Sequence, residues 1–179
     1  MIRWILLLVG GVVLGGIVHL ATMLMLPRTA TQDAYARLTP VGKVNTMTPL
    51  PEPTPAAMAV PFMDPAFAAA VCRYDLSDGP IKFSAPLSVA YTSVTFYTRN
   101  GVAYYAINDR AAGRRTIELN LMTAEQREQL PAEEDVTAAD RLIVESPSNI
   151  GLIMLRALAP EPGMMPIVRA SVAAARCRP

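Results

Sequence analysis

The first apolar run of the chain is long enough to cross a membrane. Residues 4–26, WILLLVGGVVLGGIVHLATMLML, contain no Asp, Glu, Lys or Arg, and Pro27 and Arg28 follow. In a helix, which rises 1.5 Å per residue, about 20 apolar residues span the roughly 30 Å hydrocarbon core of a bilayer. A helix also satisfies its backbone hydrogen bonds without water. The pattern therefore predicts a transmembrane anchor over residues 1–27.

A cleaved signal peptide is the alternative interpretation of this run. Its apolar region would be about 7–15 residues long, with a small-x-small cleavage site directly behind it. The run in this chain is longer, Leu26-Pro27-Arg28 is a poor cleavage site, and Ala34-Tyr35-Ala36 lies well beyond the end of the run. These features favour a retained anchor.

One face of the predicted anchor carries Gly11, Gly15 and His19 at intervals of one turn. Small residues one turn apart allow a second helix to approach closely. A His in a membrane helix usually faces protein, water or a cofactor. We therefore predict that this face contacts a partner helix. The alternatives are that His19 reaches the membrane interface near the helix end, or that it ligates a haem or chlorin.

The rest of the chain is patterned mostly as β-strands. Runs rich in β-branched and aromatic residues, or alternating between apolar and polar residues, predict strands. Such runs occupy residues 81–85, 91–98, 102–107, 116–122, 141–145 and 150–158. Asn100-Gly101 is a strong hairpin signal. Thr123 and Gln126 have the spacing of a capping box for a short helix that we expect to end near Leu130 and Pro131. The short connections predict a mostly antiparallel sheet.

Helical signals flank this β region. Asp64 and Pro65 suit the start of a short helix that would carry Cys72. Residues 166–177 predict a second helix, which would deliver Cys177. The residues of this second helix that we expect to turn inward are Ile167, Val168 and Val172.

A Pro-rich segment separates the anchor from the β region. Residues 46–65 read TMTPLPEPTPAAMAVPFMDP, and prolines at alternate positions exclude a helix and favour extended backbone. Its Met and Leu content favours a strap laid over the domain rather than a free spacer. We therefore predict an anchor over residues 1–27, a juxtamembrane segment and strap over 28–63, and a β-rich domain over 64–179. The fold class is α+β: one N-terminal transmembrane helix, then a small antiparallel sheet or sandwich with short flanking helices.

The two cysteines of the chain, Cys72 and Cys177, lie near opposite ends of the predicted domain. A disulfide that joins the two flanking helices across the sheet would fit an oxidising compartment. Two buried free thiols are the alternative. Lys and Arg flank the apolar run on both sides, so the positive-inside rule leaves its orientation open. The expected disulfide is the reason to predict a domain outside the cytoplasm.

Composition excludes several classes of function. The 179 residues are 52% hydrophobic with a net charge of +1, which argues against nucleic acid as a partner. The single His lies in the apolar run, and no His, Cys and carboxylate cluster has the spacing of a zinc site. We therefore expect no catalytic residues, no metal and no cofactor.

Two polar features stand out within the predicted domain. Asp109, Arg110 and Arg115 lie in a polar turn and could bind a carboxylate or phosphate through their guanidinium groups. The alternative is that Asp109 caps a turn and pairs with Arg110 at the surface, which contributes little. Arg156 interrupts an apolar strand. If Leu155 and Ala157 face the core, Arg156 faces outward and indicates nothing further. If that strand is covered on both faces, Arg156 must be paired and could mark a partner contact.

Four segments together resemble a known family: DPAFAAAVCRYDLSDGP, SVTFYTRNGVAYYAINDRAA, GLIMLRAL and AAARC. With the apolar run, they resemble small single-pass membrane proteins of bacteria that carry domain of unknown function 1254. The resemblance extends from the anchor, through His19 and Pro27, to Cys177. It implies an envelope location with the domain outside the cytoplasm, and it implies no activity.

Two hypotheses for function remain. The first is a non-catalytic accessory or structural subunit of a larger bacterial inner-membrane complex, with membrane lipid and an integral-membrane protein as partners. The second is an anchored binding module for a small apolar or lipidic ligand. A sizeable closed cavity in the domain would favour the second hypothesis, and an apolar, helix-sized groove with a flat outer patch would favour the first.

Overall fold

The apolar run forms one continuous helix, α1 (Ile2–Thr29). The computed structural model describes residues 1–29, 33–54, 59–112, 115–129 and 142–179, and of Pro27 only the backbone. Residues Ile2–Leu26 have a mean hydropathy of 2.3 and are not buried in the protein. The helix extends two residues beyond the predicted end at Pro27. Thr29 stabilises this last turn, because its hydroxyl donates to the Met25 carbonyl oxygen at 3.2 Å.

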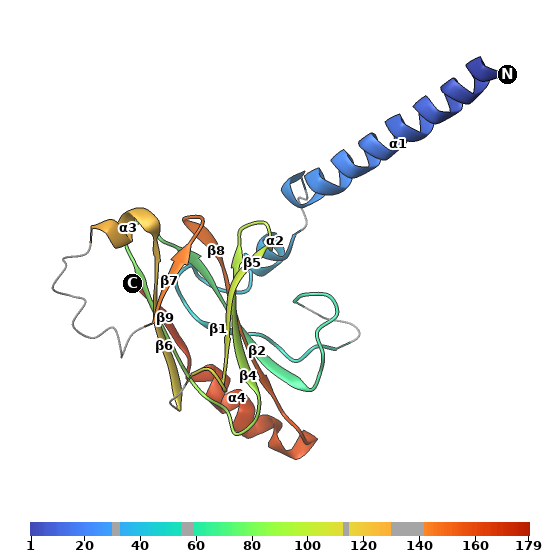
Figure 1. Cartoon of the computed structure of the whole chain (residues 1–179). Coiled ribbons are helices and arrows are strands. Elements are labelled where there is room, and N and C mark those ends of the chain that lie inside the picture. Colours follow the sequence, from blue (N-terminus) through green and yellow to red (C-terminus); the bar gives the residue numbers. More distant parts are fainter. Residues whose placement is uncertain (30–32, 55–58, 113–114, 130–141) are drawn as a thin grey trace. The chain divides into compact units, whose positions relative to one another are not determined.

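The chain divides into two compact units, Met1–Asp33 and Ala34–Pro179. The second unit is a β-sandwich with short helices (Figure 1). Its five-stranded sheet has the order β1 (Thr48–Pro49), β2 (Phe67–Asp75), β8 (Ile150–Leu158), β4 (Thr92–Thr98) and β5 (Ala103–Asn108). Its four-stranded sheet has the order β7 (Leu142–Ser146), β6 (Thr116–Thr123), β3 (Ile81–Pro86) and β9 (Arg176–Arg178). The α+β fold class is confirmed.

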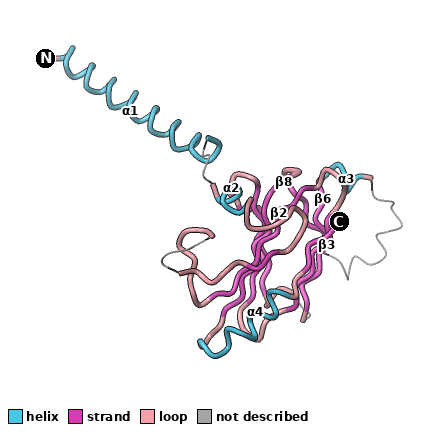
Figure 2. The backbone as a smooth tube through the Cα atoms, turned by 180° about the vertical axis from the view of Figure 1, so that it is seen from behind, coloured by secondary structure: helices cyan, strands magenta, loops and turns pink. Residues whose placement is uncertain are grey.

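Neighbouring strands are antiparallel in both sheets, except that β6 and β7 are parallel. The short helices of the second unit are α2 (Ala34–Leu38), α3 (Ala124–Glu128), the 3₁₀ helix η2 (Pro162–Met164) and α4 (Met165–Ala173). Figure 2 shows α3 and α4 at opposite ends of the sandwich. Helix α4 closes one end of the core with its two buried residues, Val168 and Val172.

Several local predictions are confirmed. The β4–β5 hairpin turns at Asn100-Gly101, where Gly101 adopts a φ of 79° that glycine tolerates best. Helix α3 starts with the predicted capping box: the Gln126 backbone N–H donates to Thr123 Oγ1 at 3.3 Å, and the Thr123 N–H donates to Gln126 Oε1 at 3.0 Å. The predicted end of this helix, near Leu130 and Pro131, lies outside the described residues.

The predicted entry helix is wrong, because Cys72 lies on strand β2. The alanines of FAAAVC favour a helix in isolation. In the sandwich, β2 is an interior strand between β1 and β8, and residues 68–72 are buried on both of its faces. A strand covered on both faces shows no alternation, so its pattern resembles that of a buried helix. Asp64 accepts a hydrogen bond from the Ala66 N–H at 2.9 Å, in a turn rather than a helix cap.

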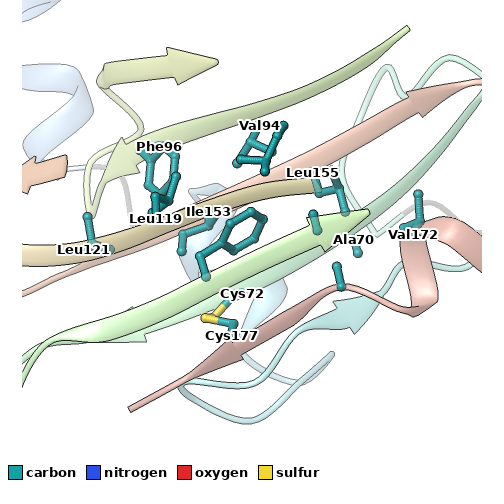
Figure 3. Packing of buried hydrophobic residues seen from close by; sticks show 14 of the residues in the cluster. Ala70, Cys72, Val94, Phe96, Leu119, Leu121, Ile153, Leu155, Val172 and Cys177 are labelled. Carbon is teal, nitrogen blue, oxygen red and sulfur yellow. A yellow bond between two sulfur atoms is a disulfide. The ribbon is translucent and has the colours of Figure 1, made fainter. Parts of the chain in front are cut away.

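The predicted exit helix is partly wrong. Helix α4 ends at Ala173, and Cys177 lies beyond it on strand β9. Val168 and Val172 point inward as predicted, but Ile167 is 57% exposed. The disulfide Cys72–Cys177 therefore joins β2 of the five-stranded sheet to β9 of the four-stranded sheet, and not one helix to another (Figure 3).

The short connection at residues 147–149 does not form a hairpin. Strand β7 pairs with β6 in the four-stranded sheet, whereas β8 lies between β2 and β4 in the five-stranded sheet. A connection of three residues can cross from one layer of a sandwich to the other as readily as it can form a turn within one layer. The short length of this connection predicted an antiparallel pair. Nothing in the local sequence distinguishes a turn within one sheet from a crossing between the two sheets.

Interdigitating apolar side chains fill the space between the two sheets (Figure 3). Phe83 and Phe96 face each other from opposite sheets, with ring centroids 6.2 Å apart in an edge-to-face arrangement. Leu155 and Val94 on one sheet, and Leu119 on the other, are at most 2% exposed. Packed side chains therefore fill the core between the sheets. The two pockets described below lie on the surface of the domain.

Candidate functional site

The outer face of the five-stranded sheet carries a second apolar cluster. Successive side chains of a strand point to opposite faces of the sheet, so every second residue of β2 points away from the four-stranded sheet. On this outer face, Val71 and Leu152 pack with Leu38 of helix α2. Tyr35, Val60 and Tyr97 pack at the margin of the cluster. The segment after α1 is thus part of the domain's structure.

The predicted strap lies along the five-stranded sheet over the residues that the structure describes. Thr48 and Pro49 form the short strand β1 beside β2, and the Leu50 N–H donates to the Ala69 carbonyl at 2.8 Å. Asn45 exchanges two hydrogen bonds with the Asp75 backbone, at 2.9 and 2.8 Å. Residues 55–58 of the predicted strap lie outside the described residues.

Arg73 holds helix α2 and the following loop onto the sheet. Its guanidinium donates to the Gly42 carbonyl at 3.0 Å and to the Thr39 hydroxyl at 3.3 Å, and it lies 5.4 Å from the centroid of the Tyr35 ring. Arg99, from the β4–β5 hairpin, lies 4.4 Å from the same centroid. A cation over an aromatic ring is attracted by the ring's quadrupole. Tyr35 is therefore held by two arginines from the sheet.

An open apolar groove runs over the uncovered part of this face. Its volume is about 460 Å³. Sheet residues form its floor, α2 contributes one margin, and the loop at residues 60–64 contributes another. Phe62 in this loop is 99% exposed and has a φ of 61°, which is uncommon for a bulky residue. The lining residues that matter below are Leu38, Phe67, Ala69, Leu152, Met154 and Arg156.

Arg156 stands on the outer face at the edge of this groove. Its strand neighbours are Ala69 on β2 and Ser93 on β4, both small. Arg156 is exposed, and neither of the ion pairs seen among the described residues, Arg127–Glu145 and Arg169–Glu52, involves it. The outward-facing arrangement considered from the sequence is therefore correct.

A second hollow adjoins Arg156 on the β4 side. Its volume is about 210 Å³, and its lining combines Arg156 and four neutral polar residues with the apolar residues Ala106, Ile107 and Ala111. The polar members of the lining are Tyr91, Ser93, Thr95 and Asn108. The sequence did not predict either hollow, although SVTFYT showed Ser93 and Thr95 on one face of a strand. The guanidinium of Arg156 thus stands between an apolar groove and a hydroxyl-lined hollow.

A buried hydrogen-bond network links the two sheets near the C-terminal end of β2. The Tyr74 hydroxyl lies 3.0 Å from the Tyr104 hydroxyl and 3.0 Å from Ser146 Oγ, which in turn donates to the Ser148 carbonyl at 2.6 Å. Tyr74 and Tyr104 belong to the five-stranded sheet, and Ser146 belongs to the other sheet. Burial raises the pKa of the Tyr104 phenol well above its ordinary value.

The raised pKa of Tyr104 makes stability fall at alkaline pH. Above about pH 10 an unfolded tyrosine ionises, whereas folded Tyr104 keeps its proton, so the unfolded state binds fewer protons. The free energy of unfolding should then fall by about 1.4 kcal/mol per pH unit from this residue alone. We expect Tyr104→Phe to show a shallower decline than the wild type in urea unfolding between pH 9 and 11.5. Parallel declines would contradict this assignment.

The residues of the predicted polar site come from two segments of the domain. Asp109 and Arg110 lie in the turn after β5, where the Asp109 N–H donates to the Thr92 carbonyl at 2.9 Å. Arg115 precedes β6 of the other sheet, and its carbonyl accepts from the Leu87 N–H at 2.8 Å. Among the described residues no ion pair joins Asp109 to Arg110 or Arg115. Binding at this turn stays a prediction.

The predicted partner-helix face lies on α1. Gly11 and Gly15 have open space where a Cβ would stand, and His19 is exposed. Contact with a partner helix, or ligation by His19, stays a prediction. Within the described part of the chain, no group of three or more His, Cys, Asp or Glu side chains is placed to hold a metal ion.

The comparisons with known proteins give a family and a fold. The family model described as a protein of unknown function, DUF1254, matches residues 44–179. The crystal structure of the VPA0106 protein from Vibrio parahaemolyticus has 14% sequence identity and a TM-score of 0.59, and the match covers 81% of this chain and 34% of that one. An uncharacterised protein from Burkholderia cenocepacia has 13% identity and a TM-score of 0.46, with 66% and 33% covered. No curated protein matches the chain.

The chain spans about a third of the length of either of these two solved structures. At 14% identity, the likeness to the Vibrio protein shows a shared fold and nothing about activity.

Proposed function

The chain belongs to the DUF1254 family of proteins of unknown function, and on that premise we propose that it is a non-catalytic accessory subunit of a larger bacterial inner-membrane complex. It would cross the inner membrane once through α1 and hold its C-terminal β-domain in the periplasm. Helix α1 has the length and hydropathy for such an anchor. The Cys72–Cys177 disulfide suits an oxidising compartment such as the periplasm.

The observation that carries this proposal is the edge strand β5. It is the last strand of the five-stranded sheet and pairs only with β4 among the described residues. Its sequence, AYYAIN, contains no charged residue and no proline. Natural proteins usually protect such an edge with Lys, Pro, a bulge or a covering segment, because its free N–H and C=O groups pair with other chains. The pairing of β5 with β4 has one register shift, at Phe96 and Tyr97, but β5 carries neither Lys nor Pro. An uncharged edge of this kind suits addition of a strand from a partner.

The proposed role is non-catalytic. The single His of the sequence lies in the apolar run, which leaves the domain without a His base for nucleophilic catalysis.

A single charge on the β5 edge should disrupt the complex. Ala106 is exposed in the middle of β5. We expect Ala106→Lys to reduce a stoichiometric partner, purified with the tagged full-length protein in mild detergent, by tenfold or more. Ala173→Lys, which adds the same charge at an exposed position of α4, should leave the partner bound. Quantitative mass spectrometry of the purified complexes measures both.

The same purification tests the predicted anchor face. Gly11→Leu and Gly15→Leu should also lower the partner's recovery if α1 packs on a partner helix. The accessory-subunit proposal fails if the extracted wild-type protein is monomeric with nothing bound to it, or if it only associates with itself. The assignment of the partner contact to the β5 edge fails if Ala106→Lys and Ala173→Lys retain the partner equally.

A further inference from the structure

We propose that the outer face of the five-stranded sheet binds a single-chain amphiphile with an anionic head group, of the class of long-chain carboxylates. The apolar groove would hold the alkyl chain, and Arg156 with the adjoining hydroxyl-lined hollow would hold the head group. The hollow shares Ala106, Ile107 and Asn108 with strand β5, but the ligand and its test are separate from the partner strand of the accessory-subunit proposal.

The apolar half of the site has the size and lining of a ligand pocket. Its volume of about 460 Å³ lies within the range of roughly 300–1,000 Å³ that is usual for small-molecule sites. Leu152 and Met154 on β8, and Phe67 and Ala69 on β2, provide apolar surface from two adjacent strands. The volume lies in a single groove, which suits one alkyl chain rather than the two chains of a phospholipid.

The face of the sheet favours an alkyl chain over a peptide. Strands β2, β8 and β4 are interior strands, so their N–H and C=O groups are already paired within the sheet. A peptide laid on this face would find few backbone partners and would leave its own amide groups poorly satisfied. An alkyl chain has no such groups, and its burial against Leu152 and Met154 is favourable without any hydrogen bond.

The polar half of the site supplies a cation with neighbouring hydroxyl groups. Arg156 is exposed between the small residues Ala69 and Ser93, which leave space on both sides of its side chain. A guanidinium binds a carboxylate through two parallel hydrogen bonds. Ser93 and Thr95 lie on the same outward face of β4 as the hollow and can donate further hydrogen bonds to an anion.

The charges around Arg156 indicate on which side the head group lies. Asp64 also lines the apolar groove, and its carboxylate accepts a hydrogen bond from the Ala66 N–H. An anion placed on the β2 side of Arg156 would be repelled by that carboxylate. Of the residues that the structure describes, those lining the hollow on the β4 side are neutral, polar or apolar, apart from Arg156, and no carboxylate is among them. The head group therefore belongs over Ser93 and Thr95, and the chain runs from there across Met154.

Photolabelling of the full-length protein tests this site. The protein is placed in phosphatidylcholine nanodiscs with a 16-carbon fatty acid that carries a diazirine in its chain. After irradiation, mass spectrometry locates the label along the sequence. We expect label on peptides that contain Ala69 and Met154, in addition to α1. Label on α1 reports the probe dissolved in the bilayer, so the ratio of groove to α1 label removes differences in partitioning.

The head group and its cation are tested by competition and by substitution. Unlabelled palmitate should reduce the groove label, whereas its uncharged methyl ester should not. Arg156→Gln should raise the palmitate concentration that halves the groove label by about tenfold. The reason is that hydrogen bonds to charged groups contribute roughly a factor of ten or more in affinity. Arg178→Gln, at an exposed position of β9, should behave as the wild type. Circular dichroism confirms that both variants are folded.

Each other result overturns the proposal. Label confined to α1 means that the groove binds no such molecule. Equal competition by palmitate and its methyl ester, or an unchanged Arg156→Gln variant, means that the groove takes up apolar molecules without recognising the head group. The labelling is repeated with a phosphatidylglycerol that carries the diazirine. If this phospholipid labels the groove and the fatty acid does not, the groove binds a bilayer phospholipid and not the single-chain ligand proposed.

Discussion

Loss of the Cys72–Cys177 bond should lower the stability of the β-domain by about 4–5 kcal/mol, the value that the chain-entropy model gives for a closed loop of roughly 100 residues. The two cysteines are 105 residues apart. Strand β9, which carries Cys177, has three residues and pairs only with β3. The disulfide fastens this short strand to the middle of the opposite sheet. We expect Cys72→Ala with Cys177→Ala to melt roughly 10–15 °C below the wild type.

Thermal unfolding of the full-length protein in nanodiscs, followed by near-ultraviolet circular dichroism, measures this difference. The reduced wild type is the matched comparison, because it lacks the bond but retains both sulfur atoms in the core. It should melt near the double variant. If the double variant and the reduced protein both melt within about 3 °C of the oxidised protein, the disulfide contributes little, and the packing of β9 on β3 must hold the strand.

Gly151→Ala should be among the most destabilising single substitutions in the domain, by about 3 kcal/mol or more. Gly151 lies on β8 opposite Tyr74 and Thr98. A Cβ at this position would overlap the Tyr74 hydroxyl and the Tyr97 carbonyl oxygen. The carbonyl belongs to the sheet backbone and cannot move without disturbing the ladder. The Tyr74 hydroxyl cannot withdraw without breaking its contacts with Tyr104 and Ser146.

Gly163→Ala is the matched control, because a Cβ there meets nothing within 4 Å. It should change the free energy of urea unfolding by less than about 1 kcal/mol, the size of an ordinary Gly-to-Ala effect. Adding Tyr74→Phe to Gly151→Ala should restore little of the lost stability, because the Tyr74 ring carbon Cζ would still overlap the new methyl group. Equal midpoints for Gly151→Ala and Gly163→Ala would show that β8 can shift to accommodate the methyl group.

The sequence predicted the parts of this fold whose signals are local. The β4–β5 hairpin follows from Asn100-Gly101, and the start of α3 follows from Thr123 and Gln126. Strand β6 was predicted because the apolar residues Ile117, Leu119 and Leu121 alternate with polar residues, and the structure buries all three. In each case the decisive contacts lie within a few residues.

The parts that were not predicted depend on distant contacts. Residues 68–72 form a strand rather than a helix because β1, β8 and both faces of the sandwich cover them, and none of this is visible in the segment itself. The groove is likewise built from α2, β2, β8 and the loop at residues 60–64. Arg156 stood out in the sequence as a charge in an apolar strand. Only the register places Ala69 and Ser93 beside it and gives it space for a ligand.

The position of β9 has a consequence for biosynthesis. A ribosome makes β9 after the eight other strands, and Cys177 emerges 105 residues after Cys72. If the domain is exported as proposed above, Cys72 has no partner thiol within its own chain until Cys177 follows it. An oxidant that acts earlier could join Cys72 to another protein's thiol. Pairing of β9 with β3 and formation of the disulfide are therefore both late steps.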